Sequence, residues 1–85
     1  MKTNKHTITI HARCPYQPVW DYYEATFTSR RFIQCEELEA AAEDVRGANT
    51  TQEGIASRLR EILPSHVSIK VVGRHGANCL TEITR

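Results

Sequence analysis

Apolar and polar residues alternate in the first third of the chain, which is the pattern of half-buried β-strands. The first alternating stretch runs from His6 to Arg13 and puts Ile8, Ile10 and Ala12 on one face. The second stretch puts Tyr23, Ala25 and Phe27 on one face. Two prolines lie between the stretches, so we predict two strands joined by a stiff link.

The apolar period then changes to that of α-helices. A first helical stripe consists of Leu38, Ala41, Ala42 and Val45, and Gly47 provides a stop signal. A second helix is predicted to begin near Thr50 and to end before Pro64. Its apolar stripe consists of Ile55, Ala56, Leu59, Ile62 and Leu63.

Strand periodicity returns with Val67, Ile69 and Val71, followed by a predicted turn at Gly73–Gly76 and a last strand over Cys79–Thr84. The order ββααββ predicts one α+β domain over residues 1–85. We expect a four-stranded antiparallel sheet with two antiparallel helices on one face. The second face has no obvious cover and is expected to be partly buried, with sheet edges that can pair with other copies.

Composition narrows the function classes. The 85 residues carry a formal net charge of +1, which gives no broad attraction to nucleic acid or membrane. The basic pairs Arg30-Arg31 and Arg74-His75 are interpreted as solvated turn residues. No apolar run approaches the roughly 20 residues of a membrane span, and the N-terminus has no apolar signal core. Three cysteines without a CxxC pair favour a reducing, cytoplasmic compartment and no metal site.

Candidate chemistry lies in the link between the first two strands. Cys14 continues the parity of Ile8 and Ala12, and Asp21 shares the parity of Tyr23. Both side chains should therefore point to the covered face at the same end of the hairpin. A thiol and an acid held together suit addition to a carbon–nitrogen multiple bond, with a nucleophile and a proton donor. Cys14 could instead be a small core residue beside a proline turn.

The ββααββ order and the spacing from Cys14-Pro15 to Asp21 resemble the 7-cyano-7-deazaguanine reductase (QueF) family of the tunnelling fold, and most of all its short, archaeosine-forming QueF-like branch. The resemblance implies that Cys14 attacks a nitrile and that Asp21 donates the proton. It implies that Gln52 and Glu53, at the position of a His-Glu pair, bind the deazaguanine. It also implies a homo-oligomer with sites between subunits.

The resemblance leaves the second reactant to be decided. The reductases carry a lysine-containing cofactor segment, whereas Gln34–Glu39 has no lysine and adds acids. No cofactor is therefore firmly implied, and NADPH enters only if the chain is a reductase. The implied partner is a 7-deazaguanine base, free or in a nucleic acid. We expect ammonia to convert the bound nitrile to an amidine; the alternatives are NADPH-dependent reduction to an aminomethyl group and a non-catalytic binding or inhibitory module.

Several residues have competing interpretations. Thr50 and Glu53 fit a capping box, in which Glu53 would serve the helix rather than a ligand. Cys35 and Cys79 are predicted to be packing residues, and Gly73 and Gly76 turn glycines. The aromatic residues Trp20, Tyr22 and Tyr23 are expected to be core, with stacking on a flat base as the alternative.

Overall fold

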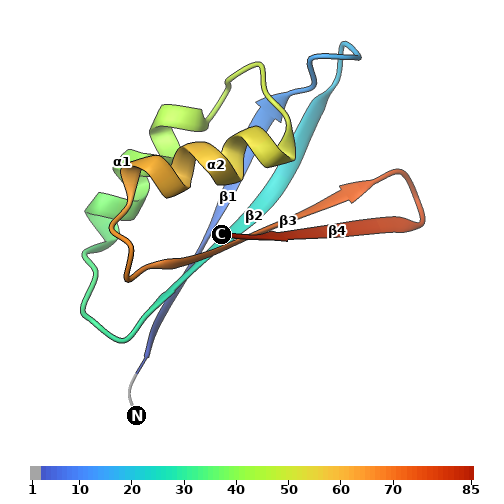
Figure 1. Cartoon of the computed structure of the whole chain (residues 1–85). Coiled ribbons are helices and arrows are strands. Elements are labelled where there is room, and N and C mark those ends of the chain that lie inside the picture. The colour runs from blue at the N-terminus through green and yellow to red at the C-terminus, as the bar shows by residue number, and fades with distance from the viewer. Residues whose placement is uncertain (1–2) are drawn as a thin grey trace.

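The computed structural model describes residues 3–85, so Met1 and Lys2 of the predicted domain lie outside the described part. The elements are β1 (Asn4–Arg13), β2 (Trp20–Ser29), α1 (Cys35–Val45), α2 (Gln52–Ile62), β3 (Ser68–His75) and β4 (Cys79–Thr84). The strands form one antiparallel sheet in the order β1-β2-β3-β4, with both helices on one face (Figure 1). The predicted α+β ββααββ architecture is confirmed.

The core lies between the sheet and the two helices, and the predicted alternation supplies it. In the β1–β2 pair Ile8 is opposite Ala25 and Ile10 is opposite Tyr23, and all four are buried. The predicted apolar stripe of α1 is buried. The predicted stripe of α2 is also buried except for Ile62. Ile62 is exposed because it is the last residue of the helix and lies at the rim of the core.

The hairpin between β3 and β4 differs from the sequence prediction. β3 continues through Gly73 to His75, and the turn occupies residues 76–78. Gly73 therefore lies in a strand, opposite Tyr23, and an added Cβ would stand 2.5 Å from the Tyr23 ring. Its missing side chain makes room for that ring. Gly76 is a turn glycine as predicted, with a φ of 77°.

The second face of the sheet has no cover within residues 3–85. It exposes Trp20, Tyr22 and Leu80, and Tyr22 has 68% of its surface open. The prediction of core positions for the aromatic residues is therefore wrong for Trp20 and Tyr22 and correct for Tyr23, because only Tyr23 has the parity of the helix-covered face. Neither described helix is long and apolar enough to cross a membrane.

The link between the helices runs along the end of β1 and is tied to it. Gly47 adopts a φ of 77°, and its N–H donates to the carbonyl of His11 at 2.8 Å. Arg13 then donates to Ala48 at 2.8 Å and accepts from Thr50 at 3.1 Å. These bonds bring the start of α2 next to the residue that follows β1, which is Cys14.

Candidate active site

A cavity of about 260 Å³ lies where the β1–β2 link, the start of α2 and the end of β3 meet. Its lining consists of Cys14, Pro15, Tyr16, Asp21, Tyr23, Thr50, Thr51, Gln52 and His75. Three of the four predicted site residues therefore line one cavity, and they come from segments far apart in the sequence. The fourth, Glu53, does not line it.

Cys14 is positioned by a short loop that closes on itself. Its N–H donates to the carbonyl of Val19 at 3.0 Å, and the N–H of Val19 donates to the carbonyl of Gln17 at 2.8 Å. The thiol is free and its residue is half-buried, so it is neither a core residue nor a fully solvated one. A half-buried free thiol at a cavity wall is open to a reactant that enters the cavity.

Asp21 is held by the tyrosine two residues further along β2. The Tyr23 hydroxyl donates a long hydrogen bond of 3.5 Å to Oδ2 of Asp21. Burial, together with the smaller effects of the negative charges of Asp21 and Cys14, raises the pKa of Tyr23 to about 12. The phenol therefore remains a hydrogen-bond donor to Asp21 at neutral pH.

Gln52 is buried, with only 4% of its surface exposed, and its amide makes three hydrogen bonds within the chain. Its Nε2 donates to the carbonyls of Val71 at 2.9 Å and Thr81 at 2.8 Å. Its Oε1 must then accept from Nε2 of His75, at 2.7 Å. Gln52 thus fixes the orientation of the imidazole, and in a neutral ring it leaves Nδ1 as the acceptor nitrogen.

His75 is a cavity residue that the sequence analysis missed. It also lines an adjoining hollow of about 310 Å³ together with Cys14 and Asp21. The sequence does contain a signal for this position, because His75 continues the inward parity of Ile69 and Val71. The prediction of a turn beginning at Gly73 cut the strand short and hid it.

Glu53 lies in the first turn of α2 and faces solvent, with its side chain 76% exposed. Its nearest ionic partner is Arg85, at 3.9 Å. The capping-box interpretation is wrong, because the N-cap is Thr51 and its hydroxyl accepts from the N–H of Gly54 at 3.1 Å. The residue three positions after the cap is therefore a glycine, which has no side chain to reach back.

The other two cysteines differ from the prediction. Cys35 and Cys79 are both exposed and free, so they are not packing residues. Cys35 is the first residue of α1, and Cys79 is the first residue of β4. Within residues 3–85 no three His, Cys, Asp or Glu side chains gather closely enough to hold a metal ion.

The arrangement supplies four groups that can exchange protons or form a covalent bond: the Cys14 thiol, the Asp21 carboxyl group, the Tyr23 phenol and the His75 imidazole. The thiol can act as a nucleophile, and either the carboxyl group or the imidazole can carry a proton. The hydrogen bonds from Tyr23 to Asp21 and from His75 to Gln52 hold these carriers in place.

The order of strands and helices is that of a tunnelling-fold domain, and one cavity brings Cys14, Asp21 and Gln52 together. Neither a protein-family model nor a curated protein sequence matches the chain. Its structure is similar to the crystal structure of the archaeosine synthase QueF-Like in the apo form, with a TM-score of 0.81 and 18% sequence identity. The match covers 98% of this chain and 90% of the other. The fold that the resemblance implied is confirmed.

Proposed function

We propose that this protein converts the nitrile of a 7-cyano-7-deazaguanine group, free or carried in a nucleic acid, into an amidine with ammonia. The observation that carries the proposal is the cavity shared by Cys14 and Asp21. The likeness in fold to an archaeosine synthase supports the substrate class. The residue types at the cavity support the reaction type, because addition to a nitrile needs a nucleophile and a proton donor.

In the first step the Cys14 thiolate adds to the nitrile carbon. One π bond between carbon and nitrogen breaks, and the nitrogen takes a proton from Asp21, which gives a covalent thioimide. Ammonia then adds to the same carbon, and the carbon–sulfur bond breaks with its electron pair leaving on the sulfur. One proton of the ammonia returns to Asp21, so that the amidine is released and both residues regain their starting forms.

Tyr23 and His75 support these steps through Asp21 and Cys14. The Tyr23 hydroxyl keeps the carboxyl group of Asp21 turned toward the cavity. His75 has its Nε2 occupied by Gln52, so Nδ1 can accept the proton of the thiol when the thiolate forms. Gln52 acts in this scheme by positioning His75 rather than by contacting the base, because both its N–H donors and its bond to His75 are committed within the chain.

Glu53 remains the proposed residue for binding the deazaguanine edge. Its carboxylate is exposed, so it can accept from two donors of a ligand that lies outside its own chain's cavity. The exposed sheet face and the unpaired edges of β1 and β4 favour a homo-oligomer, in which Glu53 of one copy meets the cavity of another. Sedimentation that gives a monomer at micromolar concentration would contradict this part of the proposal.

The two alternatives differ in what they require. Reduction requires NADPH, but the first turn of α1 carries Glu36 and Glu37, and its cap Gln34 makes no side-chain bond to the helix. Acidic residues there repel a cofactor phosphate, so the segment does not fit the cofactor and we assign no hydride step. A non-catalytic binding module is favoured by one observation, the position of Glu53 outside the cavity.

The deciding experiment incubates the protein with 7-cyano-7-deazaguanine, and separately with an RNA that carries it, in ¹⁵N-labelled ammonium. We expect an amidine that contains one ¹⁵N atom and no dependence on NADPH. An aminomethyl product formed with consumption of NADPH would establish the reductase. Binding of the base with neither product and no covalent adduct would establish the module.

A further inference from the structure

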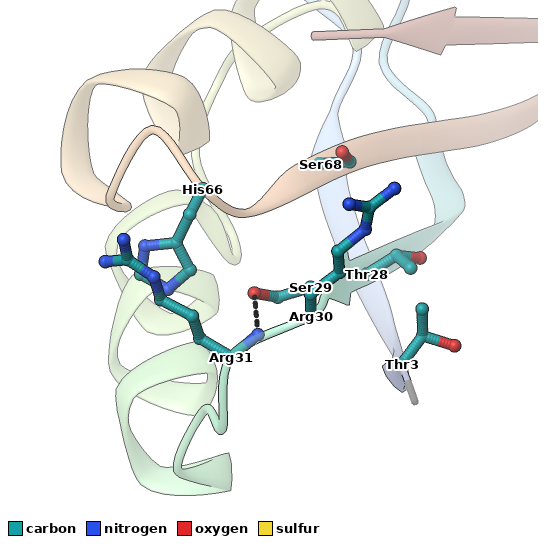
Figure 2. A pocket seen from close by; sticks show the side chains of 7 residues that line it. All are labelled: Thr3, Thr28, Ser29, Arg30, Arg31, His66 and Ser68. Atoms are coloured by element: carbon teal, nitrogen blue, oxygen red, sulfur yellow. Dashed lines mark hydrogen bonds between the residues drawn. The ribbon is translucent and has the colours of Figure 1, made fainter. Parts of the chain in front are cut away.

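A second cavity lies at the opposite end of the β1–β2 pair from Cys14. Its volume is about 340 Å³, which falls within the range of roughly 300–1,000 Å³ typical of ligand pockets. Its lining consists of Thr3, Thr28, Ser29, Arg30, Arg31, His66 and Ser68 (Figure 2). The Asn4–Ser29 pair lies eight residues along β1 from the Ala12–Asp21 pair, roughly 26 Å at the rise of a strand. A single base cannot contact both cavities of one chain.

The charged side chains of this lining are all basic. The lining contains two guanidinium groups, an imidazole and several hydroxyl groups. None of the described lining residues carries a carboxylate. Within residues 3–85 neither Arg30 nor Arg31 forms an ion pair, whereas Arg46, Arg58 and Arg85 each have an acidic partner. Unpaired guanidinium groups keep all their donors available for charge-assisted hydrogen bonds to an anion.

The backbone that carries the two arginines is held in place. Ser29 is buried, and its hydroxyl accepts from the N–H of Arg31 at 3.0 Å. The Asn4 amide donates to the carbonyl of Arg31, also at 3.0 Å. The bend after β2 is thus fixed from both sides, and the arginine side chains start from a defined position.

The opposite wall is fixed as well. His66 lies in a turn closed by a 3.0 Å bond from the N–H of Val67 to the carbonyl of Pro64, and Val67 is fully buried. The Arg60 guanidinium donates to the carbonyls of Val67 at 2.6 Å and Leu63 at 3.2 Å, which ties the turn to the end of α2. Both walls are therefore ordered by bonds that do not use the two guanidinium groups or the imidazole of the lining.

We propose that this cavity binds a phosphate group. In Figure 2 the Arg31 guanidinium extends toward His66, and that of Arg30 extends toward Ser68. The planar fork of arginine donors matches phosphate oxygens, and the hydroxyl groups of Thr28 and Ser68, paired across β2 and β3, add further donors. The proposal does not depend on the reaction proposed at Cys14. Two sources can supply the phosphate, a free ion or a phosphodiester of a nucleic acid.

The test compares the full chain with Arg30→Gln/Arg31→Gln and with Arg58→Gln. Arg58 is an exposed arginine on α2, outside this cavity, and serves as the control for lost positive charge. One arm titrates inorganic phosphate and follows the amide resonances of Arg31, His66 and Ser68. The other arm measures fluorescence anisotropy of a labelled 12-nucleotide single-stranded RNA at two salt concentrations. Circular dichroism checks that each variant is folded.

We expect binding in at least one arm, weakened about tenfold or more in the double variant and little changed in Arg58→Gln. Saturation by inorganic phosphate alone, with no RNA binding, identifies a free phosphate ligand. RNA binding that falls with salt and with loss of the two arginines identifies a phosphodiester. The proposal is overturned if neither ligand binds, or if the double variant and Arg58→Gln bind both ligands like the parent.

Discussion

The two ends of the β1–β2 pair carry different chemistry. At the Ala12–Asp21 end lie a thiol, a carboxyl group, a phenol and an imidazole, which can form a covalent bond and move protons. At the Asn4–Ser29 end lie guanidinium groups, an imidazole and hydroxyl groups, which are suited to binding and orienting an anion. The same strand pair thus separates a candidate reaction site from a candidate binding site by roughly 26 Å.

The difference shows how one small sheet can serve two tasks. The reactive groups point to the covered face, where the helix link and α2 close the cavity around them. The arginines lie where β2 ends and the chain leaves the sheet, so they remain open to solvent. Substitutions at one end should therefore leave the other end unaffected, and the first and last experiments below test that independence.

The largest effect is expected from Asp21→Asn. The amide cannot donate a proton to the nitrile nitrogen, so thioimide formation should slow by about 10²–10⁴-fold while the base still binds. Mass spectrometry of samples quenched at successive times measures the rate of thioimide formation. Asp44→Asn, on the exposed face of α1, is the matched control and should react at the parent's rate. Phosphate binding should be unchanged in both variants. A near-normal rate of thioimide formation in Asp21→Asn would show that Asp21 is not the proton donor.

A smaller effect is expected from Glu53→Gln. The amide has no charge for a two-point contact with the base edge, so affinity for the deazaguanine should fall by about ten- to a hundred-fold. The thermal midpoint should stay close to the parent's, because the helix is capped by Thr51. Calorimetric titration measures the affinity, with Glu37→Gln as a control on α1. Unchanged affinity for the deazaguanine would show that Glu53 does not bind the base.

Gly73→Ala tests the packing of Tyr23. An added Cβ would lie 2.5 Å from the ring, and overpacking of this kind costs about 1–3 kcal/mol of stability. The ring must shift, and with it the hydroxyl that contacts Asp21. Gly76→Asn is the control, because nothing lies within 4 Å of that position and asparagine tolerates a positive φ. Equal denaturation midpoints for Gly73→Ala and the parent would show that the ring can move freely.

The pH dependence of stability should reveal the raised pKa of Tyr23. Its pKa is raised to about 12 in the folded chain, against about 10 when unfolded. Between pH 10 and 12 the unfolded state loses this proton while the folded state retains it, so stability should fall by about 2 kcal/mol as pH rises through that range. The difference between the parent and Tyr23→Phe isolates this part, with Tyr22→Phe as control. A difference curve that is flat over this range would contradict the assignment.

Much of the fold could be predicted because burial sets the hydrophobic period. Ile8 and Ile10 give the face of β1, and Leu38 and Ala42 give that of α1, each through one-sided contact with the core. The parity of Cys14 and Asp21 followed from the same alternation, which is why their common cavity was foreseen. These predictions needed only local pattern and the pairing of adjacent strands.

The rest depends on contacts that no local pattern records. Gly73 looks like a turn residue, but it is a strand glycine whose role is set by the ring of Tyr23 on the neighbouring strand. His75 enters the site because β3 continues past that glycine, and Gln52 then bonds to it across 23 positions of sequence. Cys35 and Cys79 are exposed, because exposure depends on how the helices and the sheet pack together in three dimensions.

The most direct test of a reaction at Cys14 is the intact mass of the protein after incubation with 7-cyano-7-deazaguanine in the absence of ammonia. We expect an adduct of the ligand's mass on the parent, on Cys35→Ala and Cys79→Ala, and on Arg30→Gln/Arg31→Gln. We expect no adduct on Cys14→Ala. An adduct that persists in Cys14→Ala would contradict covalent chemistry at Cys14, as would a parent that forms none although iodoacetamide alkylates Cys14 readily.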